Sequence, residues 1–313
     1  MNGRALVTGG AGFIGSHLCG RLMDEGWEVL VVDDLTSGHL DNLAEARARG
    51  RIKFHQLDIR DEEFVLAVEH FAPDVLFHLA AQVSVVKSVD DPLHDAGVNV
   101  LGTINLLEAA RRVEAERVVF ASTGGAIYGD AVKLPAKESY TKHPGSPYGI
   151  SKKVAEDYFR FYQAAFGIDF VALALANVYG PRQDPFGEGG VVAIFARQML
   201  DGRRPVIYGD GLQTRDYVYV DDVVDAFVRA AGIGGGRFLN IGTGCETTVL
   251  RLFKALADEI GFTQLPVFAG PRPGEITRSV LDSTAARNVL HWQPWTSLEE
   301  GLAMTVEWMR RNR

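Results

Sequence analysis

The chain has few cysteines and no excess of positive charge. Only two cysteines occur in 313 residues, Cys19 and Cys245, and their spacing matches no metal-binding motif. Such a pair excludes a disulfide framework and indicates free thiols in a reducing compartment, so we expect a cytoplasmic protein without a metal site. The net charge of −8 argues against a nucleic-acid partner.

The sequence also lacks the apolar segments that predict a membrane span or a secretory signal. No apolar run approaches the ~20 residues that a transmembrane helix needs. The chain enters its first predicted strand at Arg4 without a signal peptide, and it shows no repeats, low-complexity tract or linker. We therefore expect no membrane partner. The hydrophobic fraction of 47% supports a substantial core, in one large domain or two small ones.

Glycines stand where a dinucleotide-binding turn would need them. Arg4 to Val7 predicts a short strand, Phe13 to Glu25 predicts an amphipathic helix, and Gly9-x-x-Gly12-x-x-Gly15 lies between them. In such a unit the backbone approaches a pyrophosphate, and the free N–H groups of the helix N-terminus face it. The spacing is one residue longer at the front than G-x-G-x-x-G, and a plain helix-entry loop is the alternative.

The acid that follows the next predicted strand favours NAD. Glu28 to Val32 predicts that strand, and Asp33 follows it, 18 residues beyond Gly15, close to the spacing of about 20 residues at which an acid holds the ribose of NAD. A carboxylate at this place can hold the ribose hydroxyls of NAD and would repel the 2′-phosphate of NADP. Arg47, Arg49 and Arg51 lie too far along the chain to act as a phosphate clamp, so we expect NAD.

Strand and helix signals alternate through the first half of the chain. Strands are predicted at 52–57, 75–79, 117–121 and 170–175, with helices over 98–113 and from Ser146-Pro147 to about Phe166. This order is typical of a doubly wound parallel sheet, an α/β Rossmann fold with its ligand at the carboxyl ends of the strands.

The regular alternation of predicted strands and helices ends after Asn177, where glycine and proline become frequent and the predicted elements are mixed. We therefore predict an NAD-binding Rossmann domain over residues 1–177 and a smaller mixed C-terminal lobe over 178–313. This second lobe would bind the substrate, and some of its segments would return to the main sheet.

Two pairs of polar residues are candidates for chemistry. Tyr148 and Lys152 stand four residues apart on one face of a predicted helix. A free tyrosine, with a pKa of about 10, becomes a useful base only where a nearby ammonium or the positive nicotinamide stabilises its phenolate. Ser122 and Thr123 follow the strand at 117–121, where a hydroxyl could relay a proton. A surface pair and an ordinary turn are the alternatives.

In combination these motifs resemble the extended short-chain dehydrogenase/reductases, and among them the nucleotide-sugar epimerases. The resemblance covers nearly the whole chain. It rests on Thr8 to Gly15, Asp58-Ile59, His78 to Gln82, Asn99, Ser122-Thr123, Tyr148 to Lys152, Asn177 to Arg182, Arg215 to Asp222 and Arg272 to Glu275.

The resemblance implies a role for each of these positions. The implied NAD-binding residues are Gly9, Gly12, Phe13, Ile14, Gly15, Asp33, Asp58, Ile59, Ala80, Ala81, Asn99, Tyr148 and Lys152. The implied catalytic residues are Tyr148, Lys152 and Thr123, with Ser122 as an alternative to Thr123. The implied residues for a UDP-sugar substrate are Asn177, Val191, Val192, Arg215, Arg272, Glu275 and Ser279.

One departure from the family pattern affects the catalytic hydroxyl. Gly124, Gly125, Ala126 and Ile127 stand between Thr123 and Tyr128, one residue more than the commonest spacing. This leaves the choice between Ser122 and Thr123 open, and we favour Thr123.

The activity that the resemblance implies is 4-epimerisation of a UDP-hexose through a 4-keto intermediate, with NAD as cofactor. A nucleotide-sugar 4,6-dehydratase and a UDP-uronate epimerase or decarboxylase are the alternatives. Dehydratases of this family carry Asp-Glu directly after the threonine, where this chain has Gly124-Gly125. A non-catalytic NAD-sensing or RNA-binding relative is a third reading, against which the intact Tyr148 and Lys152 and the negative net charge argue.

The motifs leave the sugar open between UDP-glucose, UDP-galactose, their N-acetyl forms and UDP-glucuronate. In the family, the residue four positions past the UDP-binding acid gates the space beside the sugar C2, and Ser279 is small enough to admit an N-acetyl group. The resemblance also implies a homodimer, for which the helices over 98–113 and 148–166 could supply the contact.

Overall fold

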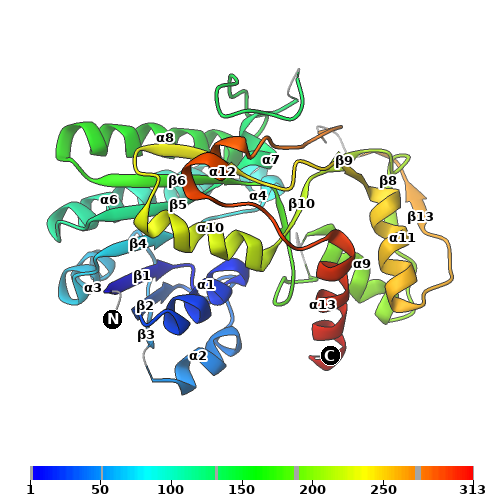
Figure 1. Cartoon of the computed structure of the whole chain (residues 1–313), viewed down its shortest axis with the longest axis horizontal. Coiled ribbons are helices and arrows are strands. Elements are labelled where there is room, and N and C mark those ends of the chain that lie inside the picture. The colour runs from blue at the N-terminus through cyan, green and yellow to red at the C-terminus, as the bar shows by residue number, and fades with distance from the viewer. Residues whose placement is uncertain (1–2, 51, 131–132, 187–189, 272–275, 313) are drawn as a thin grey trace.

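Seven short segments form one parallel sheet at the centre of the structure (Figure 1). Their order across the sheet is β11-β6-β5-β4-β1-β2-β3, and every neighbouring pair is parallel. The strands are β1 (Arg4–Thr8), β2 (Glu28–Asp33), β3 (Ile52–Gln56), β4 (Val75–His78), β5 (Arg117–Thr123), β6 (Asp169–Leu175) and β11 (Arg237–Ile241). The predicted doubly wound α/β fold is confirmed.

The structure, a computed structural model, describes residues 3–50, 52–130, 133–186, 190–271 and 276–312. The helices are α1 (Phe13–Asp24), α2 (Ala44–Ala48), α3 (Glu62–Phe71), α4 (Val85–Asp90), α5 (Pro92–Ala96), α6 (Gly102–Arg112), α7 (Gly124–Ile127), α8 (Pro147–Phe166), α9 (Val191–Leu200), α10 (Val220–Gly232), α11 (Val249–Ile260), α12 (Thr284–Leu290) and α13 (Leu298–Arg311). A 3-10 turn over Leu40–Leu43 precedes α2, and a π-helical turn over Gly97–Leu101 leads into α6.

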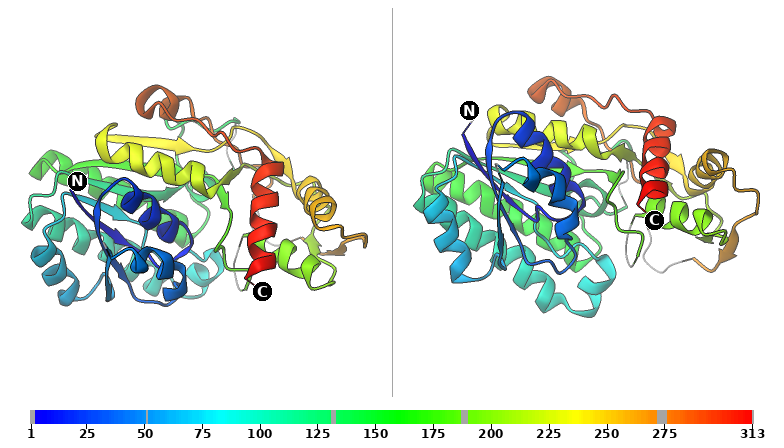
Figure 2. Two further views of the ribbon diagram at one scale, coloured as in Figure 1. Left: turned by 60° about the horizontal axis from the view of Figure 1, so that its bottom comes forward. Right: turned by 90° about the horizontal axis from the view of Figure 1, so that it is seen from below.

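Helices cover both faces of the sheet. On one face α1 packs against α10, and on the other α3, α6 and α8 lie side by side (Figures 1 and 2). The periodic apolar positions point inward: Leu18 and Leu22 of α1 and Leu106 and Leu107 of α6 are fully buried. Burying one such side chain contributes about 1.5–3 kcal/mol, so these four positions together contribute roughly 6–12 kcal/mol to the packing of the helices on the sheet.

The direction in which successive strands are added to the sheet reverses between β3 and β4. From β1 the order runs outward to β2 and β3, and β4 then pairs with the other edge of β1. In doubly wound sheets the ligand crevice lies at the carboxyl ends of the strands at such a switch point. The glycine turn follows β1 and the segment Leu79 to Gln82 follows β4, so both border this crevice.

Most predicted boundaries shift by a residue or two in the structure, and the two largest changes concern the helix at 98–113 and the strand at 117–121. The helix expected over 98–113 begins as the π-helical turn and continues as α6 only to Arg112. The strand expected over 117–121 extends to Thr123. The start of α8 is as predicted, because the Ser146 hydroxyl accepts a hydrogen bond from Gly149 N at 3.2 Å with Pro147 in the first turn.

The second half of the chain forms a smaller group of elements beside the carboxyl ends of the sheet (Figures 1 and 2). Helices α9, α11 and α13 pack against one another there. Three two-stranded sheets join them to the rest: β7 (Asn177–Tyr179) with β10 (Tyr217–Tyr219), β9 (Thr214–Arg215) with β12 (Thr247–Thr248), and β8 (Val206–Tyr208) with β13 (Val267–Ala269). Strand β11 lies instead at the edge of the main sheet, on β6. The division at 177/178 stays a prediction.

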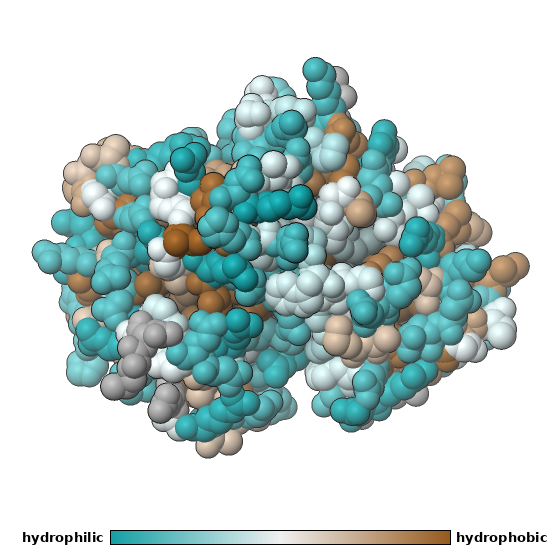
Figure 3. Space-filling model, in the orientation of Figure 1, coloured by the Kyte–Doolittle hydropathy of each residue, from teal (hydrophilic) through white to brown (hydrophobic). Residues whose placement is uncertain are grey.

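No helix among the described residues is long and apolar enough to cross a membrane. The face of the molecule drawn in Figure 3 is mostly hydrophilic, with hydrophobic side chains scattered over it in small groups.

Candidate active site

The turn after β1 requires glycine at two of its three positions. Gly9 has a φ of +70°, and a Cβ there would lie 2.7 Å from Ala80 N. A Cβ on Gly15 would lie 2.2 Å from Gly9 O, so α1 could not approach the turn with any larger residue at this point. These two glycines bring β1, α1 and the segment after β4 into close contact.

The third glycine leaves the entrance of α1 open. Gly12 is the N-cap, and no side chain of the described residues bonds the first N–H groups of the helix. A Cβ on Gly12 would meet only Gly9 O, at 3.2 Å. Phe13 and Ile14 begin the helix, and both are partly buried. The unbonded N–H groups and the positive end of the helix dipole make this place suited to a diphosphate.

Asp33 lies at the end of β2, beside the same turn. Its carboxylate accepts hydrogen bonds from Ala11 N and Leu35 N, each at 2.9 Å, and it is 7% exposed. Burial raises the pKa of Asp33, while these backbone hydrogen bonds oppose the rise. The carboxylate is therefore fixed at the edge of the crevice, with lone pairs left to accept from ribose hydroxyls.

The other predicted cofactor residues lie in the segments that follow β3 and β4. Asp58 follows β3 and is held by Arg60, which lowers its pKa. Ile59 is buried, 2.6 Å from where a Cβ on Gly102 would lie. Ala80 N donates to the Thr8 hydroxyl at 3.3 Å, and Ala81 is the next residue along this segment.

Asn99 fixes the segment after β4 from the π-helical turn. Its Oδ1 accepts from Gln82 N at 3.0 Å, and its Nδ2 donates to Gln82 O at 2.9 Å. The Asn99 side chain is 2% exposed, so it acts as a clamp on the cofactor groove. Together, the open helix entrance, the fixed carboxylate and this clamped segment fit a dinucleotide.

The proposed catalytic residues meet at the carboxyl end of β5. The Thr123 hydroxyl lies within hydrogen-bonding reach of Tyr148, and this interaction favours the phenolate. Lys152, one turn further along α8, is 3% exposed, and its Nζ donates to Ala121 O at 3.0 Å. The structure thus brings a phenol, a hydroxyl and an ammonium together at the edge where the ligand crevice lies.

The net effect of burial and of the protein's own groups is to raise the pKa of the base. Burial raises the pKa of Tyr148 to about 12, the Thr123 hydroxyl opposes this rise, and the charge of Asp95 adds to it. Burial also lowers the pKa of Lys152 to about 8, against the opposing effect of Asp95. The expectation that Lys152 lowers the pKa of Tyr148 is not met, so the positive charge of a bound nicotinamide is the remaining group that could do so.

The two candidate hydroxyls face different surroundings. Ser122 is 4% exposed, and its Oγ has no hydrogen-bond partner among the described residues. Thr123 is partly exposed and lies beside Tyr148. The residues of the lengthened segment, Gly124–Ile127, form the short helix α7, which begins after Thr123. This geometry favours Thr123 over Ser122.

The two glycines after Thr123 have different surroundings, and only Gly125 leaves space beside the candidate base. A Cβ on Gly124 would lie 2.4 Å from Leu281 Cδ1, so a longer side chain there would displace Leu281. A Cβ on Gly125 would meet only Asn177 Oδ1 and Thr123 Oγ1, both at 3.9 Å. Gly125 therefore faces the active site and brings no acid or base to it.

The described substrate residues come from the second half of the chain. Asn177 begins β7, with its Oδ1 near Gly125. Val191 begins α9 and is partly buried, whereas Val192 is 1% exposed, which leaves mainly its backbone N–H for a ligand. Arg215 ends β9, next to Thr214, whose carbonyl accepts from Arg215 Nη1 at 2.8 Å.

Ser279 lies beside β9. Its N–H donates to Thr214 O at 3.2 Å, and it is partly buried. Ser279 therefore contacts the residue that directly precedes Arg215. Arg272 and Glu275, the other predicted UDP-binding residues, lie outside the described residues.

Sequence reasoning missed Asp95, the most enclosed carboxylate near the candidate base. It lies on α5 and is fully buried. It belongs to none of the motifs, and a lone acid in a polar stretch carries no signal of burial. Its position four residues before Asn99, on the same side of a helical turn, is the signal that could have found it.

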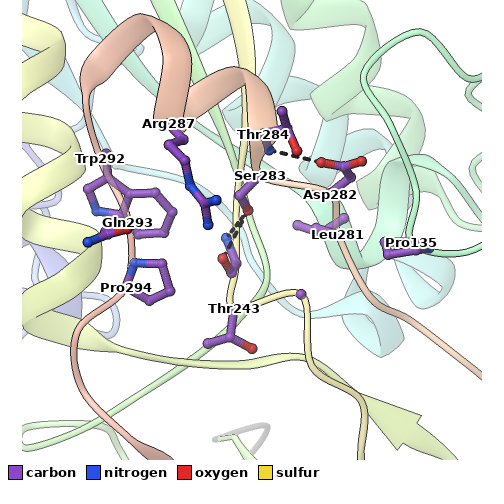
Figure 4. A pocket seen from close by; sticks show the side chains of 12 residues that line it. Pro135, Thr243, Leu281, Asp282, Ser283, Thr284, Arg287, Trp292, Gln293 and Pro294 are labelled. Atoms are coloured by element: carbon purple, nitrogen blue, oxygen red, sulfur yellow. Dashed lines mark hydrogen bonds between the residues drawn. The ribbon is translucent and has the colours of Figure 1, made fainter.

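The described residues contain no group of three or more His, Cys, Asp or Glu side chains arranged to hold a metal ion. Both cysteines are free thiols, Cys19 buried and Cys245 exposed. A pocket of about 330 Å³ lies between the end of β11 and α12 (Figure 4). Thr243, Asp282 and Arg287 line it, and it contains none of the predicted site residues.

Comparison with known proteins places the chain in a family. Residues 5–242 match the family described as "NAD dependent epimerase/dehydratase family". The chain belongs to this family. The predicted membership and the predicted dependence on NAD are confirmed for this NAD-dependent epimerase/dehydratase.

Curated and solved relatives resemble this epimerase/dehydratase over its full length. It is 50% identical over 308 residues to UDP-glucose 4-epimerase of Mycolicibacterium smegmatis, covering 98% of both chains. The crystal structure of UDP-glucose 4-epimerase with UDP-glucose from Thermotoga maritima superposes with a TM-score of 0.96, at 47% identity and 99% coverage of both chains. The UDP-glucose 4-epimerase of Thermus thermophilus in complex with NAD has a TM-score of 0.91 and 43% identity, covering 98% of this chain and 99% of that one.

Proposed function

We propose that the protein is an NAD-dependent UDP-hexose 4-epimerase that interconverts UDP-glucose and UDP-galactose. The observation that carries the proposal is the meeting of Tyr148, Thr123 and Lys152 at the crevice edge, beside a turn that fits NAD. The near full-length similarity to UDP-glucose 4-epimerases of other organisms supports it.

The mechanism assigns proton handling to the chain's own side chains. Tyr148 Oη takes the proton of the sugar 4-hydroxyl, and the Thr123 hydroxyl stabilises the phenolate through its hydrogen bond. Bound NAD supplies the hydride acceptor and donor for C4. We assign Lys152 to the same site, because its Nζ donates to Ala121 O near the carboxyl end of β5. After the 4-keto sugar has turned its other face, Tyr148 returns the proton to the 4-oxygen.

Residues of the crevice would hold the two ligands. We assign the cofactor to the N-terminus of α1, to Asp33 at the ribose, and to the segment clamped by Asn99. Asn177 borders the space next to Thr123, and Arg215 ends β9; we assign both to the nucleotide sugar. Arginine pairs well with a diphosphate because its planar fork matches two phosphate oxygens.

The glycines after Thr123 argue against a 4,6-dehydratase. Elimination of water across C5 and C6 needs an acid and a base near C6. Gly124 and Gly125 occupy the two positions after the catalytic threonine and have no proton to give, and Gly125 faces open space. We therefore favour epimerisation, in which only the 4-hydroxyl exchanges a proton with the protein.

A panel of nucleotide sugars tests the proposed function. The purified protein is incubated with UDP-glucose, UDP-galactose, their N-acetyl forms and UDP-glucuronate, and the products are identified by NMR. We expect conversion at C4 without added NAD, because the hydride is borrowed and returned. Stoichiometric formation of NADH would contradict an epimerase, and a 4-keto-6-deoxy product would show a dehydratase.

We also propose that Ser279 admits N-acetyl sugars. The contact of Ser279 with Thr214, the neighbour of Arg215, supports a place beside the substrate. In a Ser279→Tyr variant we expect N-acetyl activity to fall sharply while UDP-glucose activity survives, since a steric clash affects one substrate only. Equal loss on both sugars, or no change on either, would contradict this gate.

We propose a homodimer formed through the helices on the α6/α8 side of the sheet. Ile150 and Phe161 on α8 and Leu101 beside α6 are large apolar side chains that are each at least half exposed. We expect a Phe161→Glu variant to become monomeric in light scattering, and a Leu265→Glu variant, at an exposed site of the other lobe, to stay dimeric. A monomeric parent protein would refute the proposal.

We place this enzyme in the cytoplasm, which suits its two free thiols.

A further inference from the structure

Asp95 is a buried carboxylate that the reaction described above does not use. It lies on α5, between the π-helical turn and α8, and its side chain is fully buried. No Lys or Arg nitrogen of the described part of the chain lies within 4 Å of it. Burying a carboxylate costs free energy unless hydrogen bonds compensate for the lost water, so its partners are informative.

Each hydrogen bond of Asp95 leads to an element of the active site. Oδ1 accepts from Gln82 Nε2 at 2.9 Å and from Asn99 Nδ2 at 3.0 Å, which are the two residues that clamp the segment after β4. Oδ2 accepts from Ser151 Oγ at 2.5 Å. Ser151 is buried and belongs to α8, directly before Lys152. One carboxylate thus joins the cofactor groove to the catalytic helix.

The charge of Asp95 acts on the same helix. It raises the pKa of Lys152 against the effect of burial, and it also raises the pKa of Tyr148. Among the described residues, His78 of β4 also faces Lys152, and burial keeps it neutral because its pKa is lowered to about 3. Asp95 is therefore the negative charge that acts on both proton-handling residues.

We propose that Asp95 is a positioning residue of the epimerase: its carboxylate tethers α8 to the cofactor-groove segment and places one negative charge beside Lys152 and Tyr148. This inference rests on the proposed function for its kinetic consequences. The tether itself follows from the hydrogen bonds with Gln82, Asn99 and Ser151.

The central test is the Asp95→Asn variant, which keeps the shape of the side chain and removes its charge. Activity needs the Tyr148 phenolate, which forms as pH rises, and the Lys152 ammonium, which is lost as pH rises. A nearby negative charge opposes the phenolate and favours the ammonium, so its removal lowers both pKa values. We expect both limbs of the pH–activity profile to move to lower pH by about one unit.

Asp222→Asn is the matched control. Asp222 is also fully buried, and it accepts from Thr296 N at 3.2 Å and Thr296 Oγ1 at 3.0 Å, far from α8. We expect this variant to lose thermal stability while its pH profile stays in place. Asp95→Glu, which restores the charge, should return the limbs toward the parent position. Unmoved limbs in Asp95→Asn, with kcat reduced or not, would overturn the proposal.

A second variant covers the case in which Asp95→Asn does not fold, and a spectroscopic titration covers the case in which the protein has no epimerase activity. If Asp95→Asn does not fold, Ser151→Ala cuts the tether and keeps the charge. We expect a kcat about tenfold lower, because a charge-assisted hydrogen bond is lost. The limbs of the pH–activity profile should stay in place. An unchanged kcat would refute the tether. If no UDP-hexose is epimerised, the proposed function fails. The ultraviolet titration of Tyr148, taken as the difference from Tyr148→Phe, must then still shift to lower pH in Asp95→Asn.

Discussion

The choice between the two adjacent hydroxyls of β5 leads to a sharp prediction. Replacing Thr123 by Val removes the hydroxyl beside Tyr148 and keeps the branched shape of the side chain. The hydroxyl makes no capping hydrogen bond to α7, whose N-cap is Thr123, so the fold should lose little stability. The hydrogen bond to Tyr148 becomes stronger as the phenolate forms, and its loss should therefore appear in kcat.

The size of the effect follows from the charge on the acceptor. A hydrogen bond to a charged group contributes about 1.5–3 kcal/mol, which corresponds to roughly 10- to 150-fold in rate. Ser122→Ala is the paired control, because Ser122 Oγ is buried without a partner among the described residues. Removing an unsatisfied buried hydroxyl should leave kcat unchanged and leave the free energy of unfolding equal or higher.

The assay is a coupled measurement of UDP-glucose formed from UDP-galactose, with kcat and KM obtained for the parent and both variants. Thermal unfolding of each variant separates a loss of fold from a loss of chemistry. A Thr123→Val enzyme with the parent kcat, or a Ser122→Ala enzyme with the larger loss, would refute the assignment of Thr123.

Three further predictions concern other parts of the site. Tyr148→Phe should keep the fold and lower kcat by ~10²–10⁴-fold, the usual cost of losing a general base; near-normal turnover would rule out this base. Gly15→Ala should weaken NAD binding, measured by cofactor content after dialysis, because its Cβ would lie 2.2 Å from Gly9 O, whereas Gly20→Ala in the same helix meets nothing within 4 Å and should not. His78 has a pKa lowered to about 3 by burial, so the unfolded chain binds one more proton below pH 6.5 and stability falls as pH falls. In urea unfolding between pH 7 and pH 5, the parent should lose about 2 kcal/mol more than His78→Asn, and equal losses would count against this linkage.

The main sheet was predictable because its signals are local. The glycine turn, the apolar strands and the Ser146-Pro147 helix start each depend on a few neighbouring residues, and each appears where the sequence indicates. Strands and helices alternate along this part of the chain, and this alternation is typical of a parallel sheet. The position of Thr123 beside Tyr148 could be expected from the family pattern, although the extra residue in α7 left it open.

The parts that the sequence did not reveal depend on contacts between distant segments. Asp95 is a polar residue in a polar stretch, and only the packing of α5 against α8 shows that it is buried. The pKa of Tyr148 was expected to fall because Lys152 is near in sequence. Burial dominates instead, and burial is a property of the whole fold.

The return of β11 to the main sheet limits how the chain can be divided. β11 begins at Arg237, more than 60 residues after the end of β6, and it covers the edge that β6 would otherwise present to solvent. A fragment that ends near residue 177 would leave that edge unpaired, and an unpaired strand edge is a template for aggregation. During synthesis, the strands that precede residue 177 therefore keep one edge of their sheet open until β11 has been made and can pair with β6.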